Sequence, residues 1–221
     1  MAPVAAEKLD PSSAISLRLD RLACASVSDR PFRHMTGDSL LDPDKADVLA
    51  HDFPDPGKTG FFPVDELTFG SSFASLIEQL KSPDFVAAVG EGLGMDLAQH
   101  PQLIVVRRWS AKSDGRVHTD GEDKVATFLV YLNDDWSGSA GALRYLEGAD
   151  VDGPGTQAIP ARFGVFTAFR RSDHSWHGHP PFEGERRVVQ VFWLRDADAL
   201  ARKTRRHART AFWKIFSKKV G

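Results

Sequence analysis

Residues 125–132, Val-Ala-Thr-Phe-Leu-Val-Tyr-Leu, are the clearest strand signal in the chain. The run is short and rich in β-branched and aromatic residues, as is typical of a β-strand. Similar runs lie at 102–109, 142–146, 163–169 and 188–194, with clusters of Gly, Pro, Asp and Ser between them. The intervals are too short to hold a helix after each strand. We therefore expect antiparallel pairing, as in a β-sandwich or jelly roll.

Helical signals lie before residue 100. The segment 71–80 begins with capping serines and carries apolar residues at helical spacing. Another helix starts after Ser82 and is expected to end at glycines 90, 92 and 94, since glycine favours helix ends. A shorter helix is expected over 42–52, and a short strand near 31–35. The chain thus combines a helical first part with a β-rich second part.

The length of 221 residues suits one domain with a proper hydrophobic core. We predict a single domain, 1–221, in three parts. Residues 1–100 form a mostly helical support, 101–195 a jelly-roll core and 196–221 a basic C-terminal helix. The predicted fold class is mainly β with flanking helices, arranged as a sandwich or jelly roll.

The composition excludes several classes of protein. With 42% hydrophobic and 26% charged residues, the chain is neither disordered nor fibrous. No apolar run approaches the ~18 residues that a membrane span requires, and the first ten residues lack the pattern of a secretory signal. A single cysteine, Cys24, cannot form an internal disulfide. We therefore expect a cytoplasmic protein.

The formal charge of −2 is unevenly distributed. Residues 195–221 hold nine Lys/Arg and two Asp, so they carry +7, while the remainder carries −9. A body this acidic is not expected to bind nucleic acid. The basic C-terminal helix has two interpretations: it docks on its own acidic domain, or it makes a peripheral membrane or protein contact.

His118 and Asp120 lie two residues apart in a predicted turn before the strand 125–132. In an extended segment the side chains of residues i and i+2 point to the same face, so both can reach one ion. On its own this pair also fits a polar surface loop. It becomes a metal-site candidate only together with a further ligand.

That further ligand is offered by His174, His177 and His179, which lie between two predicted strands. One imidazole from this cluster would join His118 and Asp120 in a set of two histidines and one carboxylate. Such a set suits Fe(II), because three coordination positions stay open for other ligands. A solvated loop is the alternative interpretation of the cluster.

Arg186 and Arg187 stand at the start of the predicted strand 188–194. A guanidinium near the interior needs an anionic partner, and its planar fork can bind both oxygens of a carboxylate. We identify no carboxylate at facing strand positions, so a ligand carboxylate is one candidate. A nearby Asp or Glu at the rim is the other.

Taken together, these residues resemble the Fe(II)/2-oxoglutarate-dependent oxygenases of the prolyl 4-hydroxylase-like group. That family carries an HxD pair, a distal His and an Arg or Lys about ten residues further on. Here 57 residues separate Asp120 from His177, and 10 separate His177 from Arg187. The stretches 131–136 and 141–146 also resemble strands of the family. The resemblance spans about residues 102–195.

The resemblance implies a cupin-like double-stranded β-helix as the fold. It also implies that His118, Asp120 and His177 hold the metal. It favours Arg187 for the distal carboxylate of 2-oxoglutarate by spacing, whereas a Gly-x-Arg pattern favours Arg186. Because side chains alternate along a strand, only one of the two can point inward. Further candidates for contact with 2-oxoglutarate are Trp109, Tyr131 and Leu143, and the candidates for the pocket wall are Thr127, His179 and Trp193.

The implied activity is a dioxygenase using Fe(II), 2-oxoglutarate and O2, with ascorbate as a candidate reductant. Such an enzyme hydroxylates a C–H bond of a small metabolite or a peptidyl side chain and releases succinate and CO2. No catalytic group beyond the metal ligands is expected. The alternatives are a cupin-like metal enzyme that does not use 2-oxoglutarate and a non-catalytic binding module on the same fold.

Overall fold

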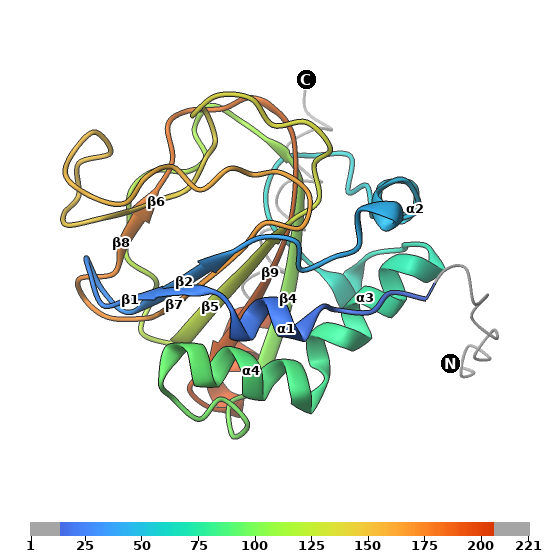
Figure 1. The fold of residues 1–221 in the computed structure, drawn as a ribbon, viewed down its shortest axis with the longest axis horizontal. Coiled ribbons are helices and arrows are strands. Elements are labelled where there is room, and N and C mark those ends of the chain that lie inside the picture. Colours follow the sequence, from blue (N-terminus) through green and yellow to red (C-terminus); the bar gives the residue numbers. More distant parts are fainter. Residues whose placement is uncertain (1–13, 206–221) are drawn as a thin grey trace.

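The structure, a computed structural model, describes residues 14–205. Its centre is a seven-stranded antiparallel sheet in the order β1-β2-β7-β5-β9-β4-β3 (Figure 1). The strands of this sheet are β1 (Ser26–Ser28), β2 (His34–Gly37), β3 (Phe62–Pro63), β4 (Gln102–Ser110), β5 (Lys124–Tyr131), β7 (Phe166–Arg170) and β9 (Gly184–Leu194). A second, two-stranded sheet is formed by β6 (Arg144–Leu146) and β8 (Trp176–Gly178).

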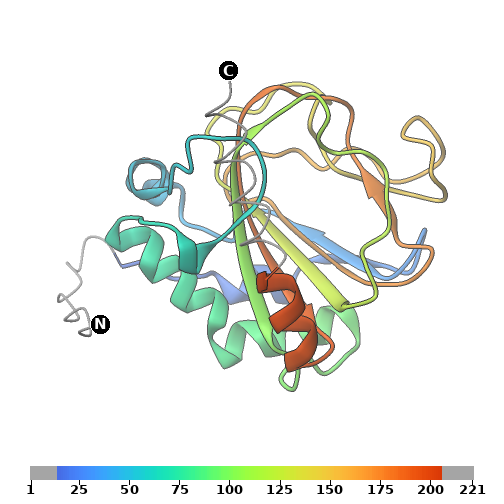
Figure 2. The ribbon, with the colours of Figure 1, turned by 180° about the vertical axis from the view of Figure 1, so that it is seen from behind.

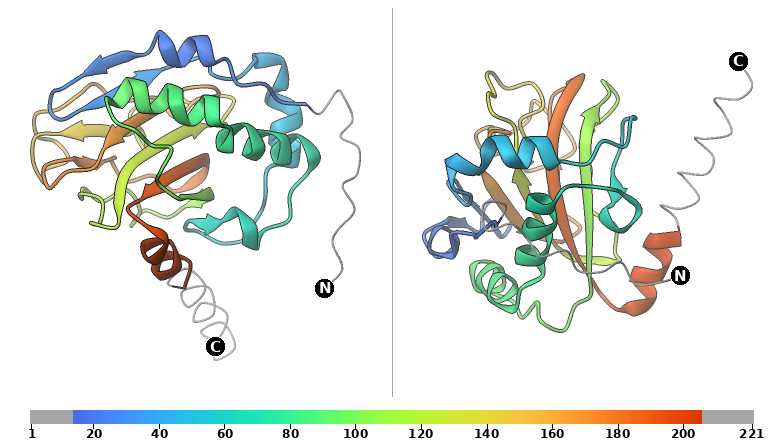
Figure 3. Two further views of the ribbon diagram at one scale, coloured as in Figure 1. Left: turned by 90° about the horizontal axis from the view of Figure 1, so that it is seen from below. Right: turned by 90° about the vertical axis from the view of Figure 1, so that its right-hand side faces the viewer.

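Helices cover one face of the large sheet (Figure 1; Figure 3, left). The helical elements are α1 (Leu19–Ala23), η2 (Pro43–Lys45), α2 (Ala46–Asp52), η3 (Val64–Glu66), α3 (Ser71–Lys81) and α4 (Pro83–Leu93). Ser82 caps α4 by accepting a hydrogen bond from the Phe85 amide, and Gly94 ends the helix at φ 67°. The predicted helices are thus present, with η2 and α2 replacing the single helix expected over 42–52.

Alternation along the strands divides the sheet into two faces. In β5 the side chains of Ala126, Phe128 and Val130 join the apolar cluster beneath α3 and α4. In β9 Val189 and Val191 join the same cluster. This face of the sheet packs in the main hydrophobic core, which holds the strands in place and so positions the side chains on the opposite face.

The opposite face is enclosed by the small sheet and the loops around it. Leu129 and Tyr131 of β5 pack there against Tyr145 of β6 and Phe169 of β7. Single backbone bridges, among them His118 with His177, extend the pairing of the small sheet. Two layers of strands therefore face each other, as predicted for a double-stranded β-helix.

The helix α4 runs through Gly90 and Gly92, so the prediction that these glycines end it is wrong. A Cβ on Gly92 would lie 2.6 Å from Sδ of Met35, and one on Gly90 would lie 2.6 Å from the Met95 carbonyl oxygen. Glycine is therefore used in this helix for close approach to β2 and to the following loop. Tertiary packing outweighs its poor helix propensity.

The first hundred residues contribute more strands than the sequence suggested. β1, β2 and β3 all belong to the large sheet, and β2 lies between β1 and β7. The strand expected at 31–35 is displaced to β2, His34–Gly37. Strands of two to four residues carry too little pattern to be recognised from sequence, and their pairing with longer neighbours fixes them.

A helical segment at 197–205 follows β9 and packs against β4 and β9 (Figure 2). Ala199 and Leu200 contact the apolar cluster of Leu103 and Phe192, and Arg202 donates to Asp123 at 2.7 Å. This part of the predicted basic helix therefore docks on its own domain. The rest of that helix, 206–221, lies outside the described residues. Within residues 14–205 no helix is long and apolar enough to cross a membrane.

Candidate active site

His118 and His177 are brought together by the backbone itself. Each amide donates to the other residue's carbonyl oxygen, at 3.0 Å from His118 and 2.9 Å from His177. This antiparallel pair places the two imidazole rings 4.4 Å apart, measured between their centroids. Two residues 59 positions apart in sequence therefore share one local structure, to which Asp120 is added by the turn that follows His118.

Both imidazoles use Nδ1 in the same way. In His118 this atom lies 2.8 Å from the Arg116 carbonyl oxygen, and in His177 it lies 2.9 Å from that of Ser175. A carbonyl only accepts, so Nδ1 carries the hydrogen in each ring. The Nε2 atoms are then left with free lone pairs, which is how ligating histidines are usually held.

Asp120 is fixed by two donors. Lys124 Nζ donates to Oδ1 at 2.7 Å, and Thr127 Oγ1 donates to Oδ2 at the same distance. The carboxylate is only 5% exposed. Its Oδ1 lies 3.9 Å from Nε2 of His118. One ligand atom from each of His118, Asp120 and His177 lies within 4.8 Å of the other two.

Electrostatics keep Asp120 and His177 in the forms that bind metal. Burial works to raise the pKa of Asp120, but Lys124, His177 and Thr127 hold it well below its usual value. Burial lowers the pKa of His177 to about 4, against the attraction of Asp120. At neutral pH the site therefore offers an ionised carboxylate and a neutral imidazole, which are the protonation states that metal coordination needs.

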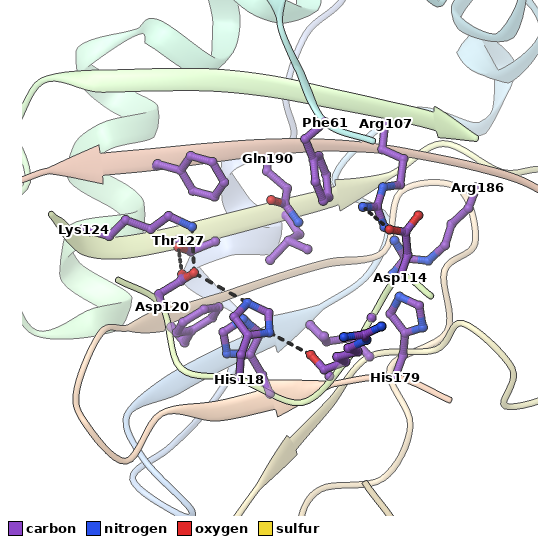
Figure 4. A pocket seen from close by; sticks show the side chains of 18 of the residues that line it. Phe61, Arg107, Asp114, His118, Asp120, Lys124, Thr127, His179, Arg186 and Gln190 are labelled. Atoms are coloured by element: carbon purple, nitrogen blue, oxygen red, sulfur yellow. Dashed lines mark hydrogen bonds and ion pairs between the residues drawn. The ribbon is translucent and has the colours of Figure 1, made fainter. Parts of the chain in front are cut away.

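The three residues open into a cavity of about 620 Å3 between the two sheets (Figure 4). Its wall combines charged and polar side chains with aromatic and aliphatic ones. The residues lining it include Phe61, Arg107, Asp114, Arg116, Lys124, Thr127, Leu129, Leu143, Phe169, His179, Arg186, Gln190 and Phe192. The volume and the mixed lining suit a small ligand with a few polar groups.

Arg186, and not Arg187, points into this cavity. Its side chain is buried, its Nε donates to the Gly141 carbonyl oxygen at 2.9 Å and its Nη2 to the Tyr131 hydroxyl at 3.4 Å. No carboxylate of the described residues pairs with it. A buried guanidinium whose protein partners are all neutral is a site for an anionic ligand.

Arg187 does not line this cavity but lies on the other face of β9, so its placement favours Arg186 over Arg187. It donates to Glu185 at 2.9 Å and lines a separate outer pocket with Asp134 and Trp136. β9 begins at Gly184, so Arg186 shares a face with Gln190 and Phe192, while Arg187 shares one with Trp193. Alternation had to exclude one of the two arginines, and the strand register excludes Arg187.

Some of the remaining predicted site residues line the cavity and others do not. Thr127, Leu143 and His179 line the cavity, and Tyr131 reaches it through its contact with Arg186. Trp193 does not line it, because it belongs to the helix-side core. Among the three histidines of the cluster, His177 joins the triad and His179 lines the cavity wall.

Trp109 also lies away from the cavity, with its Nε1 donating to Asp55 at 3.1 Å. The register of β4 shifts between Arg107 and Trp109, as in a β-bulge. The bulge breaks the alternation that would otherwise place both side chains on one face. Arg107 is the one that enters the cavity, so the expected contact of Trp109 with 2-oxoglutarate has no support in this placement.

Arg107 is a site residue that sequence reasoning missed. It is buried, and its guanidinium lies 4.0 Å from the centroid of the Phe61 ring and 3.4 Å from Asp114 Oδ1. Its Nε has no hydrogen-bond partner within residues 14–205. Burial and the charge of Arg186 lower the pKa of Arg107 to about 10, against the effect of Asp114. The sequence signal that could have identified it is a charged residue within the otherwise apolar strand predicted over 102–109.

The donor set fits Fe(II). Two imidazole nitrogens and one carboxylate oxygen leave coordination positions open, and this arrangement is characteristic of non-haem iron oxygenases. Residues 104–195 match the family model of the 2OG-Fe(II) oxygenase superfamily. This jelly-roll region is therefore similar to that superfamily.

The fold is similar to that of a solved prolyl 4-hydroxylase, and two further structures show weaker similarity. A prolyl 4-hydroxylase from Phytophthora capsici is 16% identical with a TM-score of 0.51, covering 73% of this chain and 58% of its own. A prolyl-4-hydroxylase from Pseudomonas putida is 18% identical with a TM-score of 0.47, covering 80% and 93%. HygX from Streptomyces hygroscopicus, solved with nickel and 2-oxoglutarate, is 15% identical with a TM-score of 0.47, covering 73% and 82%. The search of curated proteins found no match.

Proposed function

We propose that the protein is an Fe(II)- and 2-oxoglutarate-dependent dioxygenase that hydroxylates a C–H bond of a small metabolite or a peptidyl side chain. The products from the co-substrate would be succinate and CO2. His118, Asp120 and His177 would hold the iron. The observation that carries the proposal is Arg186, a buried cation without an acidic partner among the described residues, in the same cavity as this triad.

Arg186 supports the choice of co-substrate. A diacid can bind the metal through one end and the guanidinium through the other, and 2-oxoglutarate has this shape. Tyr131 donates no hydrogen to Arg186, so its own hydroxyl hydrogen is free to reach the same carboxylate; burial raises the pKa of Tyr131, which keeps it protonated. Leu143 and Leu129 provide apolar wall between the two ends.

When bound, the iron would supply the activation of O2 at the expense of 2-oxoglutarate. The protein's own contribution is positioning and exclusion of water. Thr127 orients the Asp120 carboxylate, and the two backbone carbonyls at 116 and 175 orient the imidazoles. Phe169, whose ring centroid lies 4.6 Å from that of His177, shields the site on the sheet side.

The test is formation of succinate from 2-oxoglutarate by the purified protein with Fe(II) and ascorbate. We expect a slow turnover without added substrate and its loss in His118→Ala. If no succinate forms, calorimetry of Mn(II) and 2-oxoglutarate binding shows whether the site fails to bind them or only lacks its primary substrate. Mn(II) binding without any 2-oxoglutarate binding would instead favour a cupin-like metal enzyme, and no Mn(II) binding would favour a non-catalytic module.

A further inference from the structure

We propose that the primary substrate carries an acidic group, a carboxylate or phosphate, which Lys124 binds beside the iron. This inference deepens the proposed function and rests on it. It concerns the end of the cavity where Lys124 and Asp120 lie, apart from the end that holds Arg107 and Arg186 (Figure 4).

Lys124 reaches the cavity through a local irregularity of β5. Strict alternation would place it with Ala126 and Phe128 on the helix-covered face. The pairing of β5 with β9 shifts register between Lys124 and Ala126, which turns the lysine to the cavity face beside Thr127. There its ammonium lies 3.5 Å from the centroid of the Phe192 ring, and its side chain is 12% exposed.

Among the described residues, the acidic partner of Lys124 is Asp120, and the metal needs that carboxylate. Lys124 and His118 both approach Oδ1, the oxygen directed towards the triad. A divalent ion bound at this oxygen would lie close to the ammonium and repel it. The loaded site therefore leaves a largely buried ammonium that requires a new anion.

The co-substrate does not provide this anion in the proposed arrangement. One carboxylate of 2-oxoglutarate binds the metal and the other binds Arg186, at the far end of the cavity. Asp114, the other carboxylate in the lining, lies near Arg107. An acidic group on the primary substrate is the remaining partner for Lys124, and the Phe192 ring would pack beside it.

The charges of the lining point the same way. The lining holds five cationic residues, Arg107, Arg116, Lys124, Arg186 and Lys203, and two carboxylates, Asp114 and Asp120, although the whole chain has a net charge of −2. Fe(II) and 2-oxoglutarate bring equal and opposite charges and leave this excess unchanged. A positive cavity in an acidic protein attracts anions selectively.

The experiment uses the full chain loaded with Mn(II) and saturating 2-oxoglutarate. Acetate, inorganic phosphate and neutral acetamide, each at roughly 10 mM, serve as probes for weak binding. Paramagnetic broadening of their NMR signals by the bound Mn(II) reports binding near the metal. Lys124→Met keeps the length of the side chain and removes the charge, and Lys112→Met is the matched control because Lys112 is 80% exposed.

We expect acetate or phosphate, but not acetamide, to be broadened by the wild type and by Lys112→Met. In Lys124→Met the apparent affinity for that anion should fall about tenfold, the loss of one charged hydrogen bond. Because Lys124 also donates to the metal ligand Asp120, the variant and the wild type are compared at saturating Mn(II), verified by titration calorimetry. Circular dichroism would verify that the variant is folded.

Three results would overturn the inference. These are no anion binding to the loaded wild type, anion binding that is equal in Lys124→Met, and a selective loss of 2-oxoglutarate affinity in Lys124→Met. The last would assign Lys124 to the co-substrate instead. Failure of the wild type to bind Mn(II) or 2-oxoglutarate at all would instead reject the proposed function, so the two failures are distinguishable.

Discussion

The two faces of the seven-stranded sheet bury side chains of opposite character. On the helix-covered face, Phe128, Val191 and Trp193 pack in an apolar core. On the cavity face, Thr127 and Arg186 surround a polar space. Neighbouring residues of one strand thus serve different purposes, so the fold is stabilised on one side of the sheet and chemistry is available on the other.

Arg186 and Arg187 show that adjacent residues of one strand can lie on the two different faces of the sheet. The two are adjacent and have the same side chain, but one faces the triad and the other pairs with Glu185 outside the cavity. Their roles follow from strand register and not from residue type. Substitutions on the cavity face should therefore impair binding with little loss of stability, and those on the helix face should do the reverse.

The largest effect is expected at the triad. Asp120→Asn keeps the shape of the side chain and removes the anionic ligand. Mn(II) affinity should fall by at least about a hundredfold, because loss of a residue that only supports a metal ligand already costs up to about that much. Titration calorimetry measures the affinity. The melting temperature should stay near that of the wild type. A variant that unfolds would contradict the view that residues on the cavity face contribute little to stability.

Phe128→Ala tests the helix-covered face. Phe128 is fully buried and its ring lies 5.0 Å from that of Phe85 in α4, centroid to centroid. Its truncation should lower the free energy of unfolding by about 3–5 kcal/mol, as measured in urea. The adjacent Thr127→Val is the control: it removes a donor to Asp120 and should weaken Mn(II) binding by about tenfold while costing little stability.

Substitutions of the two adjacent arginines compare the two faces of β9 directly. Arg186→Met should weaken 2-oxoglutarate binding by about thirtyfold or more, because a buried charged partner is lost. Arg187→Met should change it by less than about threefold, since that residue lies outside the cavity. Equal losses in the two variants would show that the register of β9 does not decide co-substrate binding.

The smallest effect is a pH dependence of the metal-free protein. Burial lowers the pKa of His177 and of His179 to about 4. The unfolded chain protonates these residues near pH 6.5 and the folded chain does not, so stability should fall as pH decreases from 6.5 towards 4. The loss between pH 6 and 5 should approach about 1 kcal/mol per histidine. Urea unfolding of wild type and His177→Gln would measure it, and the variant should lose less.

Much of the fold was predictable because the long strands are strongly patterned. β5 and β9 are rich in β-branched and aromatic residues, and their antiparallel pairing followed from the spacing of the runs. The short strands β1 and β3 were not predictable, because they are defined by pairing with neighbours distant in sequence. The course of α4 through two glycines depends likewise on what packs against it.

The triad was predictable from residue types and spacing, because HxD and a distal His are rare in combination. The orientation of Arg186 was not, since it depends on β9 beginning at Gly184, four residues before the apolar run. Lys124 and Arg107 were missed for a related reason. Both lie at register shifts, which alternation within a single strand does not reveal.

The direct backbone pairing of His118 with His177 gives the site its own reporter. Each of these two amides is hydrogen-bonded to the other residue, so neither can exchange with deuterium unless the strands around the triad separate. Their exchange rates would therefore follow the opening of the metal site itself, independently of the helix-covered core. A bound ion should slow both amides together, which makes them an isotope-labelling measure of occupancy that needs no substrate.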